Sequence, residues 1–145
     1  MKLLFDTSVI VAASLPQHPN HRSCFAQLQA ARTRNIQGYL STHSLAEFYS
    51  VMTRMPSQPR MSPIEATALI ESYLQYIEAI ALEKSDYLAA IAEMTALNIP
   101  GGGIFDALIA QAAIKAGDVD KILTLNPKHF TRLSPQIAQM IEVPS

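Results

Sequence analysis

The sequence predicts an α/β fold whose central sheet is mainly parallel. Short apolar runs at 3–5, 38–40, 77–82 and 122–124 have the length of buried strands, and helical patterns separate them. Strands that alternate with helices in this way lie parallel, and the helices cover both faces of the sheet. The chain has 145 residues, of which 49% are hydrophobic and 16% charged, and we expect one domain over residues 1–145.

The first predicted strand, at residues 3–5, ends in a group of polar side chains. Thr7 and Ser8 are both able to cap a helix that begins at Val9. A second helix is expected over residues 21–34, because its apolar side chains fall on one face. Two helices therefore precede the second strand.

The middle of the chain carries the clearest helix-start signal. A helix over residues 42–54 is followed by three prolines within 55–63, which predict an exposed loop. The segment Ser62-Pro63-Ile64-Glu65 then combines an N-cap serine, a proline at the first helical position and a glutamate at the third. A helix is therefore expected over about 63–76.

The second half repeats the alternation of helix and strand. Ser85 is expected to cap one helix, and a second helix over residues 104–116 is closed by Gly117. Asn126 precedes a proline, which is typical of a turn. The last segment, 137–143, is expected to be a short helix or an edge strand.

The composition excludes several classes of protein. Eleven Lys and Arg against twelve Asp and Glu give a net charge of −1, so nucleic acid would have to be held by a local patch or a metal. Cys24 is the only cysteine, which excludes a disulfide framework and a cysteine-ligated zinc. Asp6 interrupts the N-terminal apolar run too early for a signal peptide, and no run approaches the roughly 20 apolar residues of a membrane span. A cytoplasmic protein is expected.

Asp6 directly follows the first predicted strand. In parallel α/β sheets, ligands bind beyond the carboxyl ends of the strands, and Asp6 and Asn126 both stand at such ends. The alternative is that Asp6 only caps the helix that follows. Because Thr7 and Ser8 are available as caps, the position favours a ligand-binding role for Asp6.

Two further acids allow a structural or a functional interpretation. Asp106 lies in the first turn of a predicted helix, next to Phe105 on the expected buried face, and either stabilises the helix dipole or faces a ligand. The glycines at 101–103 favour the ligand, since glycine lets the backbone approach it closely. Glu47 follows Ser44 by three residues, as in a capping box, and periodicity alone favours a solvated position.

Taken together, these motifs resemble the PIN domain family, and within it the VapC-type toxin ribonucleases of type II toxin–antitoxin pairs. The resemblance extends from Lys2 to about Arg132, with the motifs in the family's order and spacing. The motifs are Asp6-Thr7-Ser8-Val9-Ile10, Ser44-Leu45-Ala46-Glu47-Phe48, Phe105-Asp106-Ala107-Leu108-Ile109-Ala110 and Ile122-Leu123-Thr124-Leu125-Asn126-Pro127-Lys128-His129-Phe130.

The resemblance implies a three-layer α/β/α sandwich with an acidic metal site. Asp6, Glu47 and Asp106 correspond to the family's first three acids and are expected to bind Mg²⁺ or Mn²⁺. The fourth acid of the family is replaced here by Asn126, with His129 nearby, so we expect a catalytic residue at Asn126 that adds no negative charge. The hydroxyls of Ser8 and Thr124 are expected to support the site.

The resemblance further implies a metal-dependent endoribonuclease that acts as the toxin of a toxin–antitoxin pair. Its expected partners are an RNA substrate, a cognate antitoxin and a second copy of the chain. Residues expected to hold flanking phosphates are Arg54, Arg60, Lys128 and Arg132. Because Asn126 is neutral, the alternative is a PIN-fold module that binds RNA or protein with weak or no catalysis.

Overall fold

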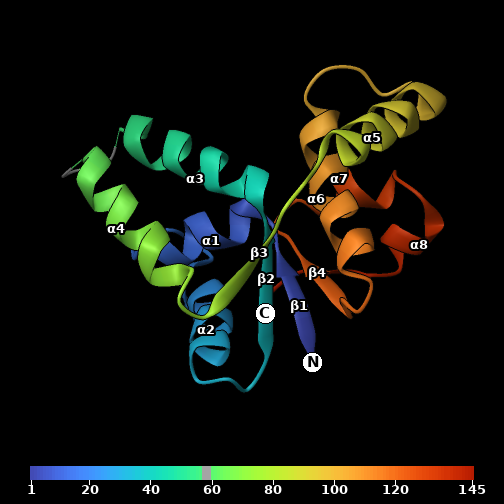
Figure 1. Cartoon of the computed structure of the whole chain (residues 1–145). Coiled ribbons are helices and arrows are strands. Elements are labelled where there is room, and N and C mark those ends of the chain that lie inside the picture. Colours follow the sequence, from blue (N-terminus) through green and yellow to red (C-terminus); the bar gives the residue numbers. More distant parts are fainter. Residues whose placement is uncertain (57–59) are drawn as a thin grey trace.

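The computed structural model describes residues 1–56 and 60–145. Within them, five parallel strands form one sheet in the order β3-β2-β1-β4-β5 (Figure 1). The strands are β1 (Lys2–Phe5), β2 (Gln37–Ser41), β3 (Ile77–Ile80), β4 (Lys121–Leu123) and β5 (Ile141–Glu142). The predicted parallel sheet is therefore confirmed, with β1 at its centre.

Helices cover both faces of this sheet, as expected (Figure 1). One face is covered by α1 (Thr7–Ser14), α2 (His21–Arg32), α3 (Thr42–Arg54) and α4 (Pro63–Tyr73). The other is covered by α5 (Lys84–Leu97), α6 (Gly103–Ala116), α7 (Pro127–Thr131) and α8 (Pro135–Ala138). The predicted three-layer sandwich is confirmed.

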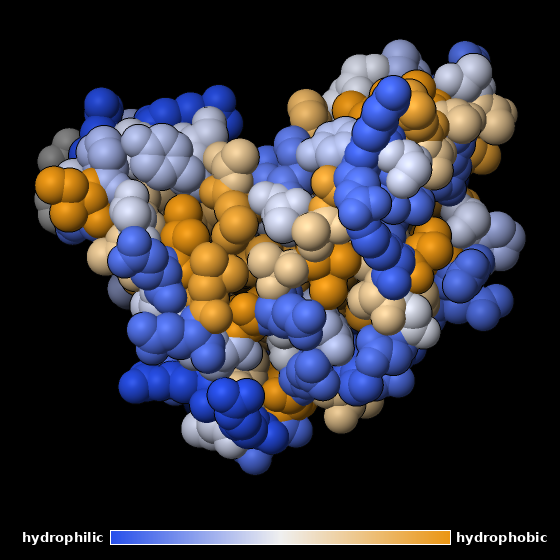
Figure 2. Space-filling view, viewed as in Figure 1, coloured by the Kyte–Doolittle hydropathy of each residue, from blue (hydrophilic) through white to orange (hydrophobic). Residues whose placement is uncertain are grey.

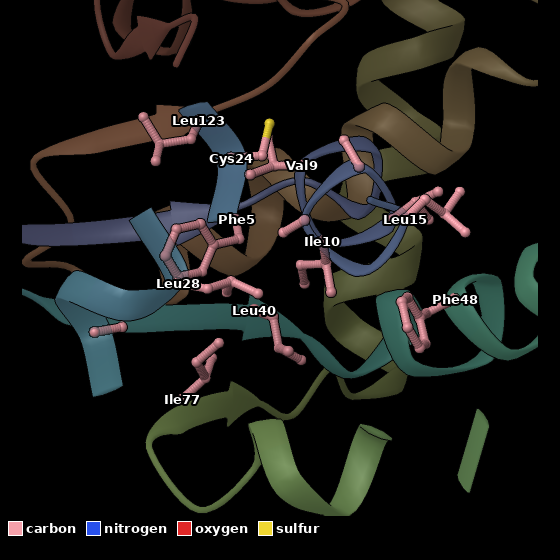
Figure 3. Close-up of a cluster of buried hydrophobic side chains, with 14 of the residues drawn as sticks. Phe5, Val9, Ile10, Leu15, Cys24, Leu28, Leu40, Phe48, Ile77 and Leu123 are labelled. Carbon is pink, nitrogen blue, oxygen red and sulfur yellow. The ribbon is translucent and has the colours of Figure 1, made fainter. Parts of the chain in front are cut away.

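Each face of the sheet has its own buried cluster, and the strands alternate between the two. Phe5, Leu40 and Leu123 pack with side chains of the α1–α4 layer (Figure 3). Their chain neighbours Leu4 and Ile122 point the other way and pack with the α5–α8 layer. Successive side chains of a strand point to opposite faces, and both faces are covered by helices. The strands are therefore nearly continuously apolar in sequence.

Several predicted helix ends are confirmed. The Ser62 hydroxyl accepts a hydrogen bond from the Glu65 backbone N–H at 3.2 Å, and the Glu65 carboxylate accepts one from the Ser62 N–H at 3.1 Å. Gly117 ends α6 in the left-handed conformation, with φ of 80°, which glycine adopts at no steric cost. The final segment contains both predicted alternatives, because α8 is followed by the edge strand β5.

Other predicted ends are wrong. Helix α1 begins at Thr7, so Thr7 and Ser8 lie inside the helix and do not cap it. Asp6 stands at the N-cap position, but its side chain makes no capping hydrogen bond. Helix α5 begins after Glu83 rather than at Ser85, since the Asp86 carboxylate accepts a 2.7 Å hydrogen bond from the Glu83 N–H. The turn predicted at Asn126 is the start of the short helix α7.

The predicted loop at 55–63 is described only in part. Its residues 55–56 and 60–62 contain neither helix nor strand, and residues 57–59 lie outside the described ones. None of the helices in the described residues has the length and apolarity that crossing a membrane requires.

Candidate active site

Three acids from distant parts of the chain line one pocket at the carboxyl end of the sheet. Asp6 follows β1, Glu47 lies in the second turn of α3, and Asp106 lies in the first turn of α6. Ser8 and Asn126 also line this pocket, which has a volume of about 470 Å³. At this end of the sheet the surface is hollowed between the α3–α4 side and the α5–α6 side (Figure 2). The predicted site residues thus come together. We call the pocket lined by Asp6, Glu47 and Asp106 the acidic pocket.

Asp6 is the most buried of the three acids, at 5% exposure. Its Oδ2 accepts hydrogen bonds from the Thr124 and Ser8 hydroxyls, both at 2.7 Å. The Thr124 hydroxyl accepts a hydrogen bond from the Asn126 N–H, and the Ser8 hydroxyl accepts one from the Leu125 N–H. Each hydroxyl therefore directs its own proton to Asp6. Burial raises the pKa of Asp6, and these hydrogen bonds counteract part of the rise. Ser8 and Thr124 therefore fix the orientation of Asp6.

Glu47 lines the acidic pocket and is half-buried, which corrects the fully solvated position that periodicity favours. The N-cap of α3 is Ser41, so the expected capping box between Ser44 and Glu47 does not form. The Thr7 hydroxyl lies 2.9 Å from Ser44 Oγ and 3.3 Å from Glu47 Oε1. Burial first, and the charge of Asp6 second, raise the pKa of Glu47.

Asp106 lies in an electrostatic setting that disfavours its charged form. Burial and then the negative charge of Asp6 raise the pKa of Asp106 to about 6, and cations partly offset the effect. Those cations are His129, whose Nδ1 lies 3.7 Å from Asp106 Oδ2, and Arg132, whose Nη2 lies 3.9 Å from it. A helix-dipole acid on the surface would not have a raised pKa.

Of the cations expected near the site, only Arg132 lies close to one of the acids. Arg54, Arg60 and Lys128 are exposed and do not line the acidic pocket. The glycines at 101–103 do not line it either. Gly103 instead packs against its own chain, where a Cβ would meet Ile99 Cγ2 at 2.5 Å and Arg132 Nη2 at 3.0 Å.

Sequence reasoning missed an aromatic pair beside the acids. Phe105, expected to be buried, is 47% exposed, and its ring stacks on the imidazole of His43 with centroids 5.1 Å apart and an interplanar angle of 5°. His43 Nε2 lies 3.5 Å from Glu47 Oε1 and, among the described residues, has no hydrogen-bond partner. Burial lowers the pKa of His43. The spacing of four residues between His43 and Glu47 on one helix is the signal that reveals this contact.

His18 and Asn20, in the loop between α1 and α2, also line the acidic pocket. The Asn20 N–H donates to His18 Nδ1 at 3.0 Å, which leaves the Nε2–H as the proton of the neutral imidazole. No sequence pattern distinguishes these two residues from ordinary loop residues.

The donor set fits a hard divalent cation. The acids supply only oxygen ligands, which Mg²⁺ and Mn²⁺ prefer, and the raised pKa values show carboxylates held in a buried, acidic setting that a cation relieves. Within residues 1–56 and 60–145, no group of three His, Cys, Asp or Glu side chains is arranged closely enough to hold a metal ion as it stands.

The fold and the site together define a three-layer α/β protein with an acid cluster at the carboxyl end of a parallel sheet. The family model described as PIN domain matches residues 3–134, and the chain belongs to the PIN domain family.

Relatives with known names support this membership. The chain is 32% identical over 122 residues to Ribonuclease VapC40 of Mycobacterium tuberculosis, which covers 82% of each chain. It is 31% identical over 111 residues to Ribonuclease VapC27 of the same organism, covering 77% of this chain and 76% of the relative. Its fold is similar to the crystal structure of VapBC2 from Rickettsia felis bound to a DNA fragment from their promoter, with a TM-score of 0.69, 22% identity and full coverage of both chains.

Proposed function

We propose that this chain is a metal-dependent endoribonuclease and the toxin of a toxin–antitoxin pair. The observation that carries the proposal is the meeting of Asp6, Glu47 and Asp106 in one pocket. Two relatives that are more than 30% identical are named ribonucleases, which supports the activity. The similarity to a VapBC complex supports the toxin role.

In this proposal, Asp6, Glu47 and Asp106 hold Mg²⁺ or Mn²⁺. The bound cation neutralises charge on the phosphate and lowers the pKa of a water. Thr124 and Ser8 keep the Asp6 carboxylate in one orientation through their 2.7 Å hydrogen bonds. The Asn126 amide, at the pocket wall, orients a water or the phosphate without adding negative charge.

The chain's own cations have a limited share in RNA binding. The net charge is −1, so there is no general basic surface to hold phosphates. Arg132 Nη2 and His129 Nδ1 lie 3.9 and 3.7 Å from Asp106 Oδ2. They hold the phosphate next to the one that is cut.

A second candidate function follows from Asn126. Its neutral amide stands where the family's fourth acid is expected, which favours a PIN-fold module that binds RNA or protein with weak or no catalysis. The two functions differ in whether bound RNA is cut.

The test is cleavage of a structured RNA by the purified protein in Mg²⁺ and in Mn²⁺. We expect cleavage that EDTA stops and that Asp6→Asn abolishes. Cleavage that survives EDTA or Asp6→Asn contradicts the mechanism. RNA that is bound but uncut in both ions supports the binding module.

The proposed setting is the cytoplasm, with a cognate antitoxin and a second copy of the chain as protein partners. Expression of the chain alone is expected to stop growth, and co-expression of the neighbouring antitoxin is expected to restore it. Harmless expression of the unpartnered chain contradicts the toxin role. Sedimentation of the purified chain tests the homodimer.

A further inference from the structure

An exposed aromatic ring stands beside the acidic pocket. Phe105 is 47% exposed although the same helix buries Leu108 and Ile109, at 2% and 1% exposure. Leaving about half of a phenylalanine side chain in water forfeits part of its burial free energy. The ring is nevertheless held in place, because the His43 imidazole stacks on one of its faces at 5.1 Å and 5°.

The Phe105 ring lies next to two acids of the proposed metal site. Phe105 and Asp106 are consecutive in the first turn of α6, and His43 and Glu47 are four residues apart on α3. The stack of Phe105 on His43 therefore joins the same two helices that bring Asp106 and Glu47 to the pocket. A group resting on the ring would lie beside a phosphate held at the acids.

We propose that Phe105, backed by His43, is the stacking platform for an unpaired nucleobase adjacent to the scissile phosphate. The inference rests on the proposed ribonuclease function and adds to it a residue that positions the RNA next to the acids. Duplex RNA keeps its bases stacked on one another, whereas loops and single strands offer bases to aromatic side chains.

Charge supports a base contact over a purely electrostatic one. A chain with net charge −1 gains little affinity from phosphates along a general surface. Base–aromatic stacking supplies affinity that is independent of net charge and tolerant of sequence. The platform thus provides binding that the surface charge does not.

The chain contains a matched control for this arrangement. Phe25 is 43% exposed and stacks on His21 with centroids 5.3 Å apart and an interplanar angle of 25°. Phe105 directly precedes Asp106, and His43 Nε2 lies 3.5 Å from Glu47 Oε1. In the second pair, His21 Nδ1 instead lies 3.0 Å from the Ala12 carbonyl oxygen, and neither ring is next to one of the three acids in the chain. Substitutions at Phe25 therefore alter a similar pair that is not joined to an acid.

The first experiment uses fluorescence, because the chain has no tryptophan. Phe105→Trp and Phe25→Trp are each made in the Asp6→Asn chain, which is expected to leave RNA uncut. Binding of a labelled single-stranded oligoribonucleotide in Mg²⁺ is followed by anisotropy, and tryptophan emission is read at saturation. We expect the oligomer to quench the emission of the Phe105→Trp chain and not that of the Phe25→Trp chain. An oligomer whose bases are removed around the cleavage site is expected to quench neither.

The second experiment measures cleavage by chains with an intact Asp6. Phe105→Ala and Phe105→Leu are expected to raise KM about 10- to 100-fold, the range for a lost base–aromatic stack, and to change kcat less. Phe105→Trp restores KM, and Phe25→Ala leaves it unchanged. Because Phe105 is exposed, the thermal midpoints of all variants are expected to match the parent chain.

The outcomes separate this inference from the function on which it rests. If RNA is bound and cut, but the emission of the Phe105→Trp chain is unquenched and KM is unchanged in Phe105→Ala, the platform alone is overturned. If KM is unchanged in Phe105→Ala but the co-expressed antitoxin no longer neutralises this variant, the ring contacts a protein partner. That outcome also overturns the platform. RNA that is neither bound nor cut by the parent chain overturns the proposed function and the platform together.

Discussion

At the amino end of the sheet the acids are paired within the chain, whereas at the carboxyl end they are left largely unpaired. Lys2 Nζ forms an ion pair with Asp118, and the Lys2 backbone N–H donates to Asp120 Oδ2 at 2.7 Å. The hydrogen bond from Lys2 lowers the pKa of Asp118. Burial instead raises the pKa of Asp6 and Asp106. The two ends thus place the same residue type in opposite electrostatic settings.

The comparison shows that charge, and not size, identifies the site. The larger pocket, of about 610 Å³, lies at the amino end and is lined by Lys2, Arg34 and Glu78 among others. The acidic pocket is smaller, at about 470 Å³. Only the smaller one gathers carboxylates whose charge is unbalanced, which is the condition for binding a cation from solution.

The largest expected difference between the two ends concerns catalysis. Asp106→Asn is expected to lower the RNA cleavage rate on the order of 10³-fold, because it removes several kcal/mol of charge stabilisation through the bound cation. Asp118→Asn, at the amino end, leaves the rate unchanged. Initial rates on one RNA at saturating Mg²⁺ measure both. Equal rates for the two variants contradict the assignment of the site.

A smaller loss is expected when the carboxylate stays and its support is removed. Thr124→Val deletes one of the two hydroxyls that donate to Asp6 Oδ2. Loss of such a supporting partner costs roughly 10- to 100-fold in metal affinity or activity. Thr124→Ser keeps the hydroxyl and is expected to recover most of the activity. A Mg²⁺ titration of each variant distinguishes loss of the ion from misfolding, because excess ion rescues only the former.

The smallest expected effect is on stability. The pKa of Asp106 is about 6 in the folded chain against 3.8 as the ordinary value, so the folded state binds more protons between these pH values. The protonated Asp106 carboxyl therefore stabilises the folded state fully below about pH 4, and this contribution is lost as the pH rises through 6. Without metal, the free energy of unfolding is expected to fall by roughly 2–3 kcal/mol from pH 4 to pH 7 on account of this residue.

Urea unfolding of the parent chain and of Asp106→Asn checks this pH dependence. The variant is expected to show a smaller decline, which the raised pKa values of Asp6 and Glu47 still cause. It is expected to be at least as stable as the parent at pH 7, since carboxylate repulsion is relieved. Added Mg²⁺ is expected to stabilise the parent at pH 7 and not the variant. A large drop in thermal midpoint for the metal-free variant would instead show that Asp106 is a structural cap.

The fold could be predicted because its signals are local. Runs such as Leu3-Leu4-Phe5 are apolar because both faces of a parallel sheet are buried, and the box at Ser62 and Glu65 is complete within four residues. Thr7 and Ser8 misled the prediction of the first helix cap. Their hydroxyls fit a cap equally well in sequence, but in the fold the Thr7 hydroxyl donates to Ser44 and the Ser8 hydroxyl accepts from the Leu125 N–H.

The site was predictable only in part, because its contacts are not local. Glu47 lies off the apolar stripe of its helix, which in sequence cannot be told from a solvated position. Its side of α3 faces the acids only because α1 and α6 pack there. Phe105 was unpredictable for the same reason. Periodicity places it in the core, but in the fold it stacks on His43 of α3 and remains about half exposed.

The hydrogen bond between Thr124 and Asp6 joins residues 118 positions apart, at opposite ends of the chain. During synthesis on a ribosome, Asp6 emerges first and waits roughly 6–24 s for Thr124 at typical elongation rates. A growing polypeptide therefore has the Asp6 carboxylate before it has the Thr124 hydroxyl that orients it. The acidic pocket is complete only after Thr124 has been translated.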